Sequence, residues 1–71
     1  MVPLTFTAIN ETNTISEVKG KPEVKRRLED MGFVVGSPIK IVSSINENLI
    51  VCVKGTRVAL DKTLANKIFV S

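Results

Sequence analysis

Histidine, tryptophan and tyrosine are all absent from this sequence, and cysteine occurs only once. Without histidine the chain lacks the ordinary base that activates a nucleophile and the imidazole ligand that transition metals commonly use in proteins. A single cysteine excludes an internal disulfide and is typical of a reducing cytoplasmic setting. We therefore expect no enzyme, no cofactor and no metal site, and a cytoplasmic protein.

The remaining chemical groups are few and scattered. Of the seven acidic residues only Glu29 and Asp30 adjoin, and neighbours on a helix point about 100° apart, which is poor chelating geometry. Cys52 lies in an aliphatic run, where a thiol is usually a buried, inert core or barrel-wall residue. No glycine loop has the spacing of a phosphate site. An arginine finger that assists GTP turnover stays open as an alternative, since Arg26, Arg27 and Arg57 are present.

Aromatic residues are also scarce, with three phenylalanines in the whole chain. An aromatic groove for polyproline ligands cannot be built from them, and base-stacking recognition of RNA is disfavoured. The formal net charge is only +3, whereas nucleic-acid binding usually needs a concentrated basic face. We expect no nucleic-acid partner, although a sequence pI near 9.4 keeps a small nucleic-acid-binding barrel as the alternative.

Long apolar runs are missing as well. The longest aliphatic stretch covers residues 49–53, far short of a bilayer span. The first twelve residues lack the charged and apolar regions of a signal peptide. We expect no direct membrane insertion, and a position at a membrane only through a partner.

What the sequence does contain is a series of short β-rich segments between turn signals. Strands are predicted over residues 4–9, 12–18, 39–45, 49–54, 57–60 and 68–70, with a bulge near Ile15 and a loop at Asn46-Glu47-Asn48. In the first segment Leu4 and Phe6 should share the buried face. Ile39 and Ile41 should likewise share one face of their strand, and Leu49, Val51 and Val53 the facing one. Asp61 is a good N-cap for a helical turn over about 62–66.

One convincing helix is predicted over about residues 22–31. Pro22 suits the first helical position, and Gly32 suits a left-handed C-terminal stop. Val24, Leu28 and Met31 form a single apolar stripe. The fold class is therefore mainly β: a small SH3-like barrel of five to six strands with this helix inserted between strands two and three, forming one domain over residues 1–71.

A basic cluster surrounds the start of the helix, at Lys19, Lys21, Lys25, Arg26 and Arg27. It is either a site for an acidic partner or a solvated helix face neutralised by pairs such as Glu23 with Arg27. We favour the solvated face.

The segment from Arg27 to Ser37 resembles the R-L-x-x-(L/M)-G-(L/F)-x-x-G-(T/S) segment of the ferrous iron transport protein A (FeoA) family. The likeness extends to Val53-Lys54-Gly55 and Ala59-Leu60-Asp61, which resemble that family's ending. Two positions depart from the family pattern: Asn10 stands where the family often has glycine, and Val35 where it often has proline. Both positions lie in predicted turns. A related module occurs in iron-dependent transcription repressors.

The resemblance implies a small cytoplasmic accessory protein of transition metal ion homeostasis that docks on the cytosolic GTPase region of the transporter FeoB and regulates ferrous iron uptake. We expect the docking cleft between the helix and the strand that follows Phe33. A homo-oligomer using the same apolar surface stays open. The candidate partner-binding residues are Lys25, Arg27, Leu28, Met31 and Phe33.

Overall fold

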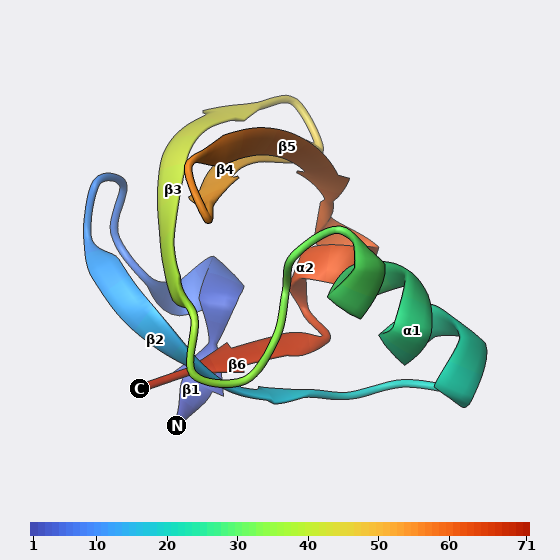
Figure 1. Ribbon diagram of the computed structural model, residues 1–71. Coiled ribbons are helices and arrows are strands. Elements are labelled where there is room, and N and C mark those ends of the chain that lie inside the picture. The colour runs from blue at the N-terminus through green and yellow to red at the C-terminus, as the bar shows by residue number, and fades with distance from the viewer.

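The computed structural model describes residues 1–71. Six strands form one antiparallel sheet in the order β1-β6-β2-β3-β4-β5, and the sheet curls around a central core with α1 packed to one side (Figure 1). In chain order the elements are β1 (Val2–Pro3), the 3₁₀ helix η1 (Leu4–Phe6), β2 (Thr12–Val18), α1 (Pro22–Asp30), β3 (Pro38–Ile45), β4 (Asn48–Val53), β5 (Thr56–Asp61), α2 (Lys62–Ala65) and β6 (Ile68–Val70).

Two bulges bend the sheet. The pairing of β2 with β6 shifts register between Ile15 and Glu17, and the pairing of β3 with β4 shifts between Ile41 and Ser43. An extra residue kinks a strand and increases its twist. Strand β2 can therefore pair with β3 over its first half and with β6 over its second. The predicted bulge near Ile15 is confirmed.

The turns between strands rely on left-handed backbone conformations. Lys54 and Gly55 both have positive φ, of 51° and 74°, as a two-residue turn matched to the twist of its strands requires. Asn10 and Asn46 also have positive φ, which asparagine tolerates better than most residues. The loop predicted over three residues is shorter, because Asn48 already belongs to β4.

Helix α1 has the predicted start and stop. Pro22 is its first residue, and Gly32, with a φ of 105°, follows the C-cap Met31. The Gly32 N–H donates to the Glu29 carbonyl and the Phe33 N–H donates to the Leu28 carbonyl, each at 2.9 Å. This pair of bonds is a Schellman motif, which satisfies the free carbonyls and turns the chain back into the barrel.

Helix α2 is capped by Asp61, whose Oδ1 accepts a hydrogen bond from the Leu64 N–H at 2.8 Å. The predicted cap is thus confirmed, and the helical turn ends at Ala65. The structure contains no helix with the length and apolar character needed to cross a membrane.

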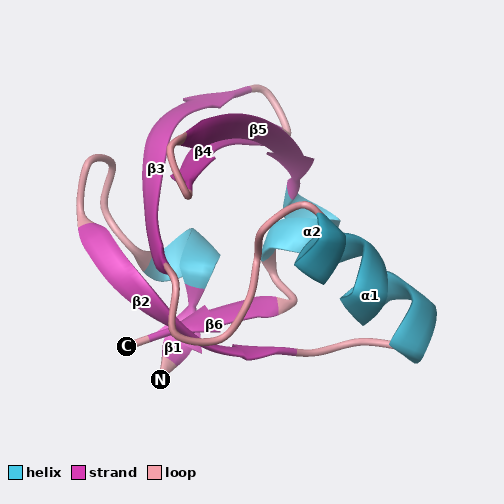
Figure 2. Cartoon of the chain, in the orientation of Figure 1, coloured by secondary structure: helices cyan, strands magenta, loops and turns pink.

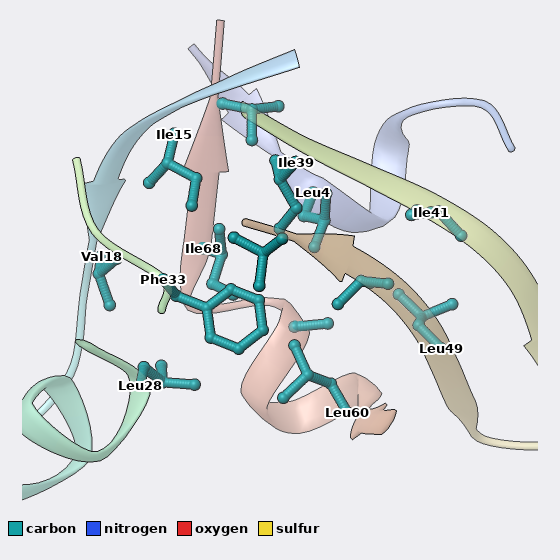
Figure 3. Packing of buried hydrophobic residues seen from close by; sticks show 14 residues of the cluster. Leu4, Ile15, Val18, Leu28, Phe33, Ile39, Ile41, Leu49, Leu60 and Ile68 are labelled. Carbon is teal, nitrogen blue, oxygen red and sulfur yellow. The ribbon is translucent and has the colours of Figure 1, made fainter. Parts of the chain in front are cut away.

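The core gathers apolar side chains from nearly every element, with the ring of Phe33 among them (Figure 3). The predicted inner faces of β3 and β4 are confirmed, since Ile39, Ile41 and the alternate residues of β4 are all buried. The cluster comprises Leu4, Ile15, Val18, Leu28, Phe33, Ile39, Ile41, Leu49, Val51, Val53, Leu60, Ala65, Ile68 and Val70.

The prediction for residues 4–9 is wrong. Leu4–Phe6 form a 3₁₀ turn, drawn as helix in Figure 2. The carbonyl of Leu4 accepts from both the N–H and the hydroxyl of Thr7, at 3.0 and 2.8 Å. Three residues per turn separate Leu4 from Phe6 around the axis. Leu4 is therefore buried, whereas Phe6 is 78% exposed.

Candidate docking surfaces

Helix α1 presents three of the five candidate partner-binding residues to solvent. Lys25 and Arg27 are exposed, and Met31 is 37% exposed at the C-terminal end of the helix. Leu28 and Phe33 are core residues with essentially no accessible surface, because the Schellman turn brings the side chains that flank it onto the core. Only Lys25, Arg27 and Met31 can touch a partner without unfolding; we call these three the α1 surface.

The basic cluster around α1 lies in solvent. Lys19, Lys21, Lys25, Arg26 and Arg27 are all exposed. The Nζ of Lys19 lies 4.6 Å from the centroid of the Phe69 ring, a cation–π contact. The hydrogen bonds made by side chains lie elsewhere, at η1, α2 and the chain's last residue. The charges of α1 are therefore available to a partner.

Two cavities are present, and neither borders α1. The cleft expected between α1 and the following strand is thus not formed. Phe33, a candidate partner-binding residue that lies between the helix and this strand, fills the core.

The larger cavity, about 350 Å³, lies between the N-terminal segment, β3, β4 and α2. Its lining includes Thr5, Thr7 and Ser44, and its only titratable group is Lys62. It brings together no nucleophile with a base and no carboxylates, so it offers no catalytic arrangement.

The smaller cavity, about 210 Å³, lies on the outside of the sheet. Lys40, Cys52 and Lys54 line it together with Pro38. Cys52 is half-buried there, as a barrel-wall residue with its neighbours Val51 and Val53 in the core. Sequence reasoning did not find this surface, because its members come from separate strands.

The residues that bind metals do not converge. The structure contains no group of three or more histidine, cysteine, aspartate or glutamate side chains placed to hold one ion. Glu29 and Asp30, the only adjoining acids, are both exposed on α1.

Nearly the whole chain is similar to known proteins. A family model described as the FeoA domain matches residues 2–71. An Fe(2+) transport protein A of Methanocaldococcus jannaschii is 31% identical over 70 residues, which cover 99% of this chain and 85% of that protein.

Solved structures show the same fold. The crystal structure of Stenotrophomonas maltophilia FeoA, a prokaryotic SH3 domain protein complexed with zinc, has a TM-score of 0.87 and 26% identity, and covers 100% of this chain and 91% of its own. A manganese-dependent transcriptional repressor has a TM-score of 0.88 at 19% identity, covering 97% of this chain and 35% of the repressor. The predicted SH3-like fold is confirmed, and about a third of the repressor chain has the same fold.

Proposed function

The chain belongs to the FeoA family, and on this basis we propose that it is an accessory protein of ferrous iron uptake that docks on the cytosolic GTPase region of a FeoB-type transporter. It acts in the cytoplasm and reaches the inner membrane through that partner. It performs no reaction of its own.

The observation that carries this proposal is the α1 surface. Met31 is an apolar side chain left partly exposed one helical turn beyond the exposed cation Arg27, and Lys25 is exposed further around the same helix. Its neighbours on the apolar stripe are already packed, Leu28 fully and Val24 partly, so the core does not need it. A flexible thioether beside cationic side chains suits an adaptable protein contact.

Regulation by contact is consistent with the inventory of reactive groups. No histidine is present, the single thiol is half-buried in the sheet, and the cavities hold no paired acid and base. What remains for function is the shape and charge of the surface.

The proposal is tested by capturing the purified cytosolic portion of the transporter on this chain. Met31→Asp is expected to weaken capture about tenfold or more, since a charge replaces an apolar contact at the interface. Its circular dichroism spectrum should match that of the wild type, because Met31 lies outside the core cluster.

Ile45→Asp is the matched control, since Ile45 is 57% exposed at the far end of β3. It should bind as the wild type does. Failure of the wild-type chain to bind the transporter, both in solution and in membranes, would contradict the proposed function.

A further inference from the structure

A row of four residues crosses the outer face of the sheet. The strand registers place Thr12 opposite Lys40, Lys40 opposite Cys52, and Cys52 opposite Arg57. The two central residues are flanked along their strands by buried residues of the inner face, Lys40 by Ile39 and Ile41 and Cys52 by Val51 and Val53. Because side chains alternate between the faces of a strand, the whole row points outward.

Positive charge is concentrated along this row. Lys40 and Arg57 lie on strands two apart, about 10 Å from each other at the usual strand spacing. Lys54, two residues beyond Cys52, lines the same 210 Å³ cavity as Lys40. Two cations thus line one hollow, Arg57 lies opposite its Cys52 on the next strand, and none of the residues that line the hollow is acidic.

Apolar groups adjoin the cations. Ile50 stands opposite Ala59 in the next outward pair of β4 and β5; Ile50 is half-buried and Ala59 is exposed. Pro38, also exposed, lines the hollow. We call Pro38, Lys40, Ile50, Cys52, Lys54, Arg57 and Ala59 the sheet surface.

We propose that the sheet surface binds an acidic segment of the transporter's cytosolic portion, with carboxylates between Lys40, Lys54 and Arg57 and apolar side chains against Ile50 and Pro38. This inference rests on the proposed function and adds to the α1 surface a second contact, on different elements. Complementary charge would speed association and fix the orientation of the complex.

The composition of the surface favours a protein over other anionic partners. Single-stranded nucleic acid is held by aromatic stacking platforms, and the sheet surface contains no aromatic residue. Recognition of anionic lipid usually uses clusters of four to eight basic residues, whereas three are gathered here. Carboxylates spaced among apolar side chains match both components of the surface.

The test compares two charge reversals of equal size. Lys40→Glu/Arg57→Glu alters the sheet surface and Lys25→Glu/Arg27→Glu alters the α1 surface, so each changes the net charge by the same amount. Affinity for the transporter's cytosolic portion is measured for both at two salt concentrations. The sheet variant is expected to bind about tenfold more weakly and to lose part of the salt dependence.

Arg57→Glu alone is the variant less prone to misfold, since Arg57 is exposed whereas Lys40 is half-buried. It should weaken binding about threefold and leave the circular dichroism spectrum unchanged. Equal affinity of wild type and both sheet variants would overturn the inference while leaving the proposed function intact.

Cys52 supplies a second readout. It is the only thiol and forms part of the hollow, so an acidic segment seated there should slow its modification by a maleimide severalfold. Unchanged labelling at saturating transporter would count against the inference.

A direct probe removes the dependence on the transporter. Amide shifts of the labelled chain are followed on adding the peptide Glu-Glu-Leu-Glu-Glu-Leu, a single-stranded oligonucleotide, or phosphatidylserine vesicles. The inference expects the peptide to shift residues of β3, β4 and β5 around Cys52. Absence of those shifts, or tighter binding of the oligonucleotide or the vesicles at this face, would refute it even if the wild-type chain proved not to bind the transporter.

Discussion

Replacement of Phe33 by alanine tests how the helix and the barrel are held together. Phe33 has no exposed surface, and its ring lies among the core side chains near Leu28 and Ile68 (Figure 3). Its N–H also completes the Schellman turn by donating to the Leu28 carbonyl. The side chain therefore fixes the point where the chain returns from α1 to the sheet.

The expected loss is large relative to the stability of so small a domain. Truncating a buried phenylalanine to alanine costs about 3–5 kcal/mol, because transfer free energy is lost and a cavity is left. Chains of this size unfold with roughly 4–10 kcal/mol in total, at about 0.05–0.15 kcal/mol per residue. Phe33→Ala should consequently be marginally stable or unfolded at 25 °C.

Urea unfolding followed by circular dichroism is the suitable assay, because the chain has no tryptophan or tyrosine to serve as a fluorescent probe. Val35→Ala is the control: Val35 lies two residues away and is 66% exposed, so the change should stay within about 0.5 kcal/mol. A loss below about 1 kcal/mol for Phe33→Ala would refute the assignment of this ring to the core.

Three further predictions concern the caps, a turn and metals. Asp61→Ala should lower the free energy of unfolding by about 1 kcal/mol, because the α2 cap is lost. Asp61→Asn keeps an equally good cap and should change this free energy by only about a few tenths of a kcal/mol. Equal losses of thermal stability in the two variants would contradict this. Gly32→Ala should lower the free energy of unfolding by about 1–3 kcal/mol, because a φ of 105° strains any residue with a Cβ even where there is space for that Cβ. An unchanged denaturation midpoint would contradict this, because it would show that the turn relaxes. After dialysis against buffer containing Fe²⁺ or Zn²⁺, the protein should retain less than one equivalent of metal ion by elemental analysis, since no three ligand side chains converge. Retention of one metal ion per chain would disprove that prediction.

The parts of the fold that local chemistry specifies could be predicted from the sequence. Pro22 and Gly32 marked the two ends of α1, and Asp61 marked the start of α2, because helix ends need particular residues. Alternating aliphatic residues fixed the inner faces of β3 and β4. These signals act over a few residues and need no knowledge of the rest of the chain.

The misassigned segment shows where such signals fail. The alternation of Leu4 and Phe6 with threonines fits a strand, but the hydroxyl of Thr7 adds a second hydrogen bond to the Leu4 carbonyl and supports a tight turn instead. Periodicity alone cannot show which of these two outcomes prevails.

The candidate site could be predicted only in part. A docking role requires exposed side chains, and this holds for Lys25, Arg27 and Met31. Leu28 and Phe33 are core residues instead. An apolar stripe in the sequence does not reveal which of its members the barrel covers. The row from Thr12 to Arg57 depends on the registers of three strand pairs. Those registers are set in part by the bulge in β3, and a one-residue shift would have turned the row inward.

The most direct test of the central claim, that this chain acts by docking, is a titration of the isotopically labelled chain with the purified cytosolic portion of a FeoB-type transporter. We expect saturable amide shifts confined to α1 around Arg27 and to the outward residues of β3, β4 and β5, with the core residues unmoved. No shift at excess transporter, or shifts gathered around the cavity near Thr7 and Lys62 instead, would contradict it.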